Sequence, residues 1–153
     1  EDGGSDVEVI LRLLVPDAQS SVPLGEKFGV MPHRVSCLAR EACELNLSLI
    51  GVSFHCGSGC HDPDAYVTAI KMAKVAMDEI NVVLREFGRP ECSLLDIGGG
   101  YPGLDGAGGD EGRFSGVALP PPSGTDGEEG KNAGDKTVDI AEVVTPLVDK
   151  LFP

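Results

Sequence analysis

Three short apolar runs alternate with segments of helical periodicity, and this alternation restricts the fold more than any other feature of the chain. The runs are residues 7–15 (VEVILRLLV), 48–54 (SLIGVSF) and 92–97 (CSLLDI). Runs of this kind are typical of strands, and the second and third resemble strands buried on both faces of a parallel sheet. Because strict strand–helix alternation favours right-handed crossovers, the sequence predicts an α/β fold with a parallel sheet covered by helices.

The helical segments begin with residues that favour helix starts. The first, over residues 32–46, opens with a proline, and its apolar side chains recur at steps of three and four. In the second, Asp62 is a natural N-cap and a proline follows it, which predicts a helix over 63–84. A third helix is expected over 138–151, with a bend at Pro146.

Residues 103–137 interrupt this pattern. They are rich in glycine, contain three consecutive prolines and carry few apolar side chains. A segment like this cannot offset its ordering entropy by burial. We therefore expect a flexible, solvated, acidic insertion between the last strand and the last helix.

Charge and cysteine content exclude several classes of protein. The chain has 25 Asp and Glu against 12 Lys and Arg, a formal charge of -13, which argues against binding to nucleic acid or an anionic membrane. No apolar run approaches the roughly 18 residues that a membrane span needs. Five cysteines are an odd number and too few for a disulfide scaffold, so we expect reduced thiols and a cytoplasmic protein.

Two glycine-rich motifs follow predicted strands. They are GVSFHCGSGC at 51–60, in which residues 57–59 are expected to form a small-residue loop into the next helix, and DIGGGYPG at 96–103. Ligands bind α/β folds at the carboxyl ends of parallel strands, and glycine lets backbone amides approach an anion closely. Either motif alone favours a simple turn, but together they predict one anionic cofactor group held between two loops.

The cluster His55, Cys56, Cys60 and His61 suggests zinc as an alternative. The spacing is not the usual Cys-x2-Cys and no second ligand pair follows, so we expect no metal site. A nucleophilic Cys56 or Cys60 activated by His55 is no better supported. A lone cysteine at a strand end is more often a small buried apolar residue.

At these motifs the chain resembles the pyridoxal-phosphate-dependent decarboxylases of ornithine, diaminopimelate and arginine. The HxGSGC form looks like the ornithine type. The matching stretch runs from about Val7 to Gly103. Its motifs fall in the family's order and spacing: LRL at 11–13, EKFG at 26–29, GVSFHCGSGC at 51–60 followed by DP, and LLDIGGGYPG at 94–103.

The resemblance implies a fold and an activity. Residues 1–153 would supply about three consecutive βα units of a TIM (β/α)8 barrel that binds pyridoxal 5'-phosphate, with residues 103–137 as a flexible insertion. The reaction implied is decarboxylation of ornithine to putrescine and CO2, in polyamine biosynthesis. The lysine that bonds the cofactor and the Cys-Asp pair of the substrate pocket would lie outside this chain, so we expect it to be inactive alone.

The resemblance also implies roles for particular residues of the cofactor site. His55 matches the histidine that stacks on the pyridoxal ring and helps direct protonation. The residues matching the phosphate-binding groups are Ser58, Gly98, Gly99 and Gly100.

Arg12 matches an arginine near the pyridine ring, for which the family predicts an acidic partner outside this chain. Lys27 matches a lysine that forms an interchain salt bridge in the family's homodimer. Two alternatives stay open. One is a catalytically inactive homologue that acts by binding a regulatory partner, and the other is an enzyme acting on arginine, lysine or diaminopimelate.

Overall fold

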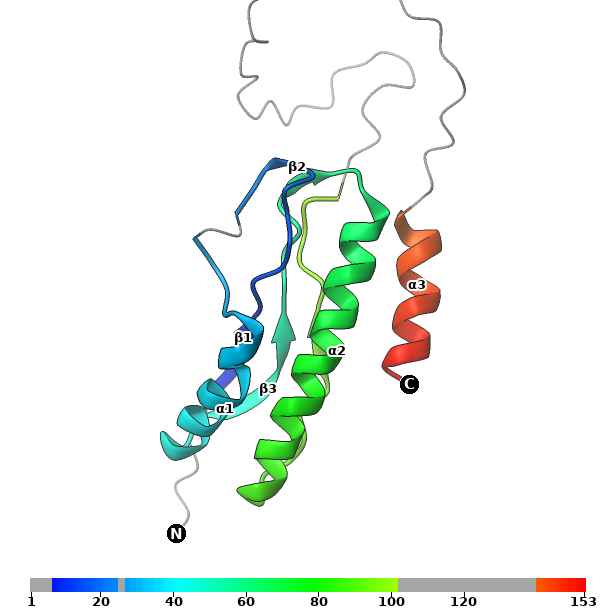
Figure 1. Ribbon diagram of the computed structural model, residues 1–153. Coiled ribbons are helices and arrows are strands. Elements are labelled where there is room, and N and C mark those ends of the chain that lie inside the picture. The colour runs from blue at the N-terminus through cyan, green and yellow to red at the C-terminus, as the bar shows by residue number, and fades with distance from the viewer. Residues whose placement is uncertain (1–6, 25–26, 102–139) are drawn as a thin grey trace, which may run out of the picture. The chain divides into compact units, whose positions relative to one another are not determined.

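The computed structural model describes residues 7–24, 27–101 and 140–153 (Figure 1). The predicted insertion at 103–137 therefore lies outside the described residues. The described residues form, in chain order, β1 (Glu8–Arg12), β2 (Ser20–Val22), the 3-10 helix η1 (Pro32–Arg34), α1 (Val35–Glu44), β3 (Ser48–Ser53), β4 (Ser58–Cys60), α2 (Pro63–Glu86), β5 (Leu94–Asp96) and α3 (Ile140–Leu151).

The main sheet is parallel and has the strand order β1-β3-β5. One register row aligns Leu11 with Val52 and Leu95, and the next aligns Arg12, Ser53 and Asp96. Because successive side chains on a strand point to opposite faces, these two rows lie on opposite faces of the sheet. The parallel α/β architecture predicted from the alternation is therefore confirmed.

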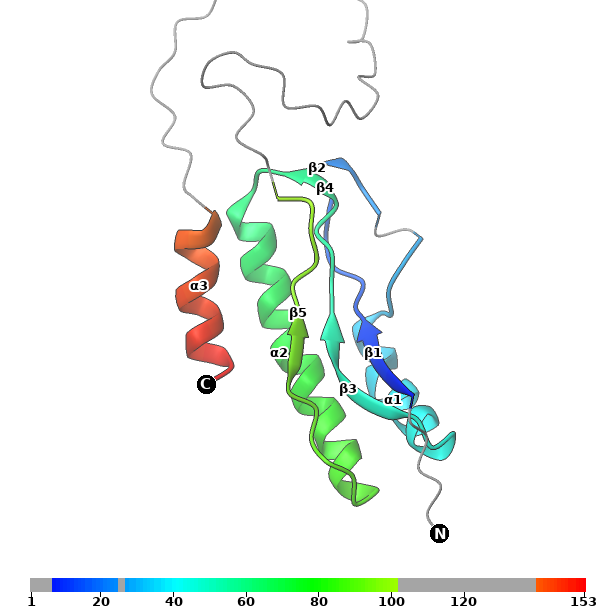
Figure 2. The same cartoon turned by 180° about the vertical axis from the view of Figure 1, so that it is seen from behind.

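Helices cover one face of this sheet. Seen from behind, β1, β3 and β5 lie in front of α1 and α2 (Figure 2). Val52 on the covered face and Ile70 on α2 are both fully buried. Burial of one such side chain contributes roughly 1.5–3 kcal/mol. On the other face, Ile10 and Leu94 are each 40% exposed, so the described residues leave that face partly open.

The start of α2 follows the local signals in the sequence. Oδ1 of Asp62 accepts a hydrogen bond from the backbone amide of Asp64 at 3.0 Å, and Pro63 occupies the first turn. This cap satisfies one of the amides that a helix start leaves unpaired. The helix runs two residues beyond the predicted end near Leu84, to Glu86.

The other predicted elements are present with shifted bounds. The strand expected over 7–15 is limited to Glu8–Arg12, followed by an isolated bridge between Leu13 and Val30. The helix expected over 32–46 is a 3-10 turn followed by α1. It ends before Asn46, whose φ of 57° is left-handed.

The last helix, α3, packs against α2 and contains Pro146. It contributes Ile140 and Val144 to the same apolar core as the sheet and the other helices. Within the described ranges, no helix is both long and apolar enough to cross a membrane.

Candidate functional site

The two glycine motifs lie side by side because the strands that precede them are neighbours. β3 and β5 pair in parallel, and the ladder continues where the amide of Phe54 donates to the carbonyl of Asp96 at 3.1 Å. Beyond the strands, the amide of Cys60 donates to the carbonyl of Gly100 at 3.2 Å. A backbone hydrogen bond therefore joins the two motifs.

Two glycines of the second motif are held tightly against the first. A β-carbon added to Gly98 would lie 2.2 Å from the carbonyl oxygen of Phe54, and one added to Gly100 would lie 2.0 Å from that of Gly57. Both glycines also have positive φ angles, 70° and 87°. Only glycine fits these two positions. Gly99 is different, because its β-carbon would meet only Nε2 of His55, at 3.8 Å.

His55 lies just beyond β3, and its ring is next to the glycine loop, which we define as residues 98–100. Nδ1 of His55 accepts a hydrogen bond from the amide of Gly57 at 3.0 Å. Because Nδ1 is an acceptor, the neutral ring carries its proton on Nε2. That nitrogen is the one near Gly99, so the ring presents an N–H group beside the glycine loop.

The structure distinguishes the three glycine amides that the sequence treated alike. The amide of Gly98 already donates to Oδ1 of Asp96 at 2.8 Å. In the described part of the chain, neither the amides of Gly99 and Gly100 nor the exposed hydroxyl of Ser58 have a hydrogen-bond partner. Among the residues predicted to bind phosphate, these three donors are available to an anion, and closely spaced backbone amides are well suited to bind one.

One local prediction about the first motif is wrong. The sequence suggested that residues 57–59 form a loop leading into the helix, but Ser58–Cys60 form β4, which pairs antiparallel with β2. A β-carbon on Gly57 would lie 2.1 Å from Oγ of Ser20, and the φ of Gly57 is 84°. The partner strand lies far away in sequence, so composition around residue 58 contains no sign of it.

Two tyrosines that the sequence analysis did not single out stack on each other next to the glycine loop. The rings of Tyr66 and Tyr101 stack with their centroids 5.0 Å apart and their planes inclined by 12°. Tyr101 directly follows the glycine loop and is 40% exposed, whereas Tyr66 lies in the first turn of α2 and is fully buried. Both are aromatic residues beside a glycine motif and a helix start, which is the only sequence signal that could have identified them.

The hydroxyl of Tyr66 is buried, and among the described residues its polar neighbour is the Cys60 thiol, with no nitrogen or oxygen atom in hydrogen-bond geometry. Burial raises the pKa of Tyr66, and the nearby thiols of Cys60 and Cys56 raise it further. The Tyr66 side chain is therefore neutral over the physiological range, and its hydroxyl has only a weakly hydrogen-bonding thiol beside it.

The sequence also singled out Arg12 and Lys27. Arg12 lies in one register row with Ser53 and Asp96, and its guanidinium carbon lies 5.1 Å from the centroid of the Phe28 ring. Arg12 has no salt bridge to any residue that the structure describes. Lys27 is exposed, and its side chain likewise has no ion pair within the described ranges.

The cysteines next to His55 are poor nucleophiles. Cys56 and Cys60 are fully buried. Burial raises the pKa of the Cys56 thiol to about 12, with Cys60 and Asp17 adding to the effect. A thiol with this pKa remains protonated at neutral pH and is unreactive. Within the described residues, no group of three or more His, Cys, Asp or Glu side chains is arranged to hold a metal ion.

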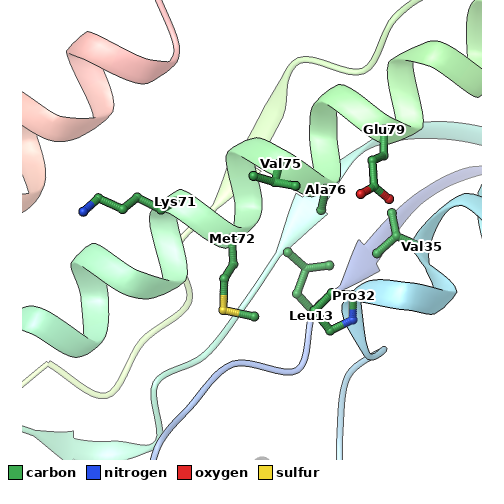
Figure 3. A pocket seen from close by; sticks show the side chains of 8 residues that line it. All are labelled: Leu13, Pro32, Val35, Lys71, Met72, Val75, Ala76 and Glu79. Carbon is green, nitrogen blue, oxygen red and sulfur yellow. The ribbon is translucent and has the colours of Figure 1, made fainter.

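A cavity of about 240 Å³ lies away from the glycine motifs, against α1 and α2 (Figure 3). Apolar side chains line most of it, with Lys71 and Glu79 as the charged members. None of the site residues that the sequence predicts lines this cavity. Its lining is Leu13, Pro32, Val35, Lys71, Met72, Val75, Ala76 and Glu79.

The motifs and the fold have counterparts in known proteins. The ornithine decarboxylase of Panagrellus redivivus is 41% identical over 103 residues, which cover 66% of this chain and 22% of that protein. Antizyme inhibitor 2 of Xenopus laevis is 40% identical over 100 residues, covering 65% of this chain and 21% of that protein. The chain thus spans about a fifth of the length of these relatives.

Among solved structures, the arginine decarboxylase of Paramecium bursaria Chlorella virus matches with a TM-score of 0.65 and 27% identity, over 95% of this chain and 30% of that one. The family model for the pyridoxal binding domain of pyridoxal-dependent decarboxylases matches residues 2–118, which is more than half of the chain. Sequence and fold lead to the same conclusion: this chain belongs to the pyridoxal-dependent decarboxylases and carries part of their pyridoxal binding domain.

Proposed function

We propose that this chain forms the phosphate-binding side of the cofactor site in a decarboxylase that converts ornithine to putrescine and CO2. One observation carries the proposal: two glycine motifs are joined by the Cys60–Gly100 hydrogen bond and expose free amide donors next to the ring of His55. A phosphate group needs such a cluster of donors, and an aromatic cofactor ring needs a flat surface beside it.

The residues of the site fit pyridoxal phosphate. The amides of Gly99 and Gly100 and the hydroxyl of Ser58 would donate hydrogen bonds to the phosphate. The Gly57 amide holds the His55 ring in one orientation, so this ring would lie flat on the cofactor and keep its plane fixed. When bound, the cofactor supplies the electron sink for the electrons released as the substrate's carboxylate leaves as CO2.

The open face of the sheet suggests how the site is completed. Ile10 and Leu94 are partly exposed on the face that also carries Arg12, Ser53 and Asp96. We propose that this face is the interior of a β/α barrel, in which the chain supplies about three βα units. Arg12 would then face the pyridine ring, and further barrel strands would supply its acidic partner, the cofactor lysine and the Cys-Asp pair.

Because Lys27 is exposed, it is available for the salt bridge of a cytoplasmic homodimer.

Ornithine is the proposed substrate because the match to a curated ornithine decarboxylase is strong and the first motif has the ornithine form. The residues that would contact the side chain of the substrate lie outside this chain, so arginine and lysine are the competing substrates to assay. The identity to antizyme inhibitor 2 supports a second candidate, a regulatory homologue without catalysis.

The test is to purify the protein that carries these residues at its native length and to add pyridoxal phosphate. Binding is followed by the visible absorbance of the cofactor, and release of CO2 is compared for ornithine, arginine and lysine. The proposal predicts cofactor binding and fastest turnover of ornithine. Binding without turnover of any substrate supports the regulatory candidate, and failure to bind the cofactor contradicts the proposed site.

A further inference from the structure

We propose that Tyr101 is a positioning residue: by stacking on Tyr66 it holds the glycine loop in the shape that binds the cofactor phosphate. This inference rests on the proposed function and adds a residue to it. Tyr101 itself needs no contact with the cofactor, because it acts through the backbone that precedes it.

The glycine loop needs support from outside, because three consecutive glycines have high conformational freedom and lose much entropy when ordered. At its start, Oδ1 of Asp96 holds the amide of Gly98. At its end, Cys60 holds the carbonyl of Gly100. Both of these contacts leave the amides of Gly99 and Gly100 free, and the next side chain in the sequence is that of Tyr101.

Tyr66 makes a firm anchor for this side chain. It lies in the first turn of α2, a 24-residue helix that Asp62 caps, and its ring is fully buried. The stack therefore connects the exit of the glycine loop to the buried first turn of a long, capped helix. The nearly parallel rings, inclined by 12°, give a specific contact and not merely an apolar one.

The stack predicts a selective effect on ligands. If Tyr101 only stabilised the fold, its loss would weaken every ligand of the cofactor site equally. If it positions the glycine loop, its loss will weaken ligands that carry the phosphate and spare those that lack it. Pyridoxal and pyridoxal phosphate differ in just this group, so the ratio of their dissociation constants reports the state of the glycine loop.

The experiment uses the native-length protein and four variants. Tyr101→Leu removes the ring, and Tyr101→Phe keeps it. Phe87→Leu is the matched control, since Phe87 is an aromatic residue of nearly the same exposure, 39%, at the other end of α2. Tyr101→Met is the fourth variant and keeps an apolar contact without a ring, so the proposal stays testable even if the leucine variant does not fold. Dissociation constants for pyridoxal phosphate and pyridoxal are measured by equilibrium dialysis, with thermal unfolding as the folding control.

We expect Tyr101→Leu and Tyr101→Met to weaken pyridoxal phosphate about 5-fold to 10-fold and to leave pyridoxal unchanged, in line with the strength of an aromatic pair. Tyr101→Phe and Phe87→Leu should match the wild type. An equal loss for both ligands, or no loss for either, overturns the inference. If the wild type itself does not prefer pyridoxal phosphate to pyridoxal, the proposed phosphate site fails instead.

Discussion

The backbone of Gly100 runs so close to that of Gly57 that a β-carbon on Gly100 would lie 2.0 Å from the Gly57 carbonyl oxygen. Non-bonded carbon and oxygen atoms do not approach each other this closely, so a β-carbon on Gly100 would require the backbone to move on both sides of the contact. The contact between these two glycines therefore ties the two halves of the candidate site to each other, and any side chain at residue 100 must force them apart.

Gly100→Ala should accordingly destabilise the protein by about 3 kcal/mol or more, because steric overlap adds to the cost of a left-handed alanine. Gly88→Ala is the control. Gly88 has a φ of 64°, also left-handed, but its β-carbon would meet no atom within 4 Å. We expect that variant to lose only about 1 kcal/mol. Urea unfolding measures both, and equal losses would show that the Gly57 contact is unimportant.

Gly99→Ala should separate folding from binding. The added β-carbon meets only Nε2 of His55, at 3.8 Å, which is an ordinary contact, so stability should change by less than about 1 kcal/mol. The methyl group would nevertheless occupy the space beside the free amides. We expect weaker binding of pyridoxal phosphate by about 10-fold, measured by cofactor titration; unchanged affinity would place the phosphate elsewhere.

His55→Ala should lower turnover at least 10-fold, because it removes the ring that is proposed to lie on the cofactor. It also leaves the amide of Gly57 without its acceptor, at a cost of about 1 kcal/mol in stability. His55→Asn is the matched control for this second effect, since an asparagine oxygen can accept from the amide two residues on. We expect the asparagine variant to recover stability but not turnover, and unchanged kinetics in both variants would contradict the proposed role.

Tyr66→Phe should leave the protein equally stable or raise its stability by about 1 kcal/mol. The substitution removes a buried hydroxyl that has only the weakly hydrogen-bonding Cys60 thiol beside it, and it keeps the ring that stacks on Tyr101. Thermal unfolding of the two proteins gives the answer. A loss of more than about 1 kcal/mol would mean that the hydroxyl has a strong partner, for which the Cys60 thiol is the candidate.

Alkaline pH should weaken the fold through buried thiols. Burial raises the pKa of Cys92 to about 11 from 9.0, so the folded state holds this proton more tightly than the unfolded state. The contribution of this proton to the free energy of unfolding is fully present below pH 9. About 2 to 3 kcal/mol of it is lost as the pH rises through about 11. Cys92→Ala should reduce this loss, as unfolding at pH 8 and pH 10.5 can measure. An unchanged pH dependence would contradict the contribution of this thiol.

Chemical labelling of the cysteines offers a simple check of the core. Cys37 is exposed, whereas Cys43, Cys56, Cys60 and Cys92 are buried. We expect Cys37 to react rapidly with Ellman's reagent at pH 8 and the other four thiols of this chain to react only on unfolding. Rapid reaction of Cys56 or Cys60, identified by peptide mapping, would show that the core beneath the first motif is open.

Local signals in the sequence predicted most of the fold. The start of α2 could be predicted because Asp62 and Pro63 act on the backbone next to them. The pairing of β2 with β4 could not be predicted, since each strand has three residues and its partner lies far along the chain. The predicted strands are longer than the observed ones for the same reason. The strand β5 ends where its pairing with β3 ends, and not where the apolar run ends.

The sequence by itself determined the alternation of strands and helices, the position of the two glycine motifs and the family that they resemble. Only the tertiary structure decided which amides are free, which nitrogen of His55 accepts a hydrogen bond, and that the rings of Tyr66 and Tyr101 stack. The physical reason is the range of the interactions. Periodicity and caps act within one or two helical turns, whereas these contacts depend on the register of β3 with β5 and on backbone angles that only the folded chain imposes.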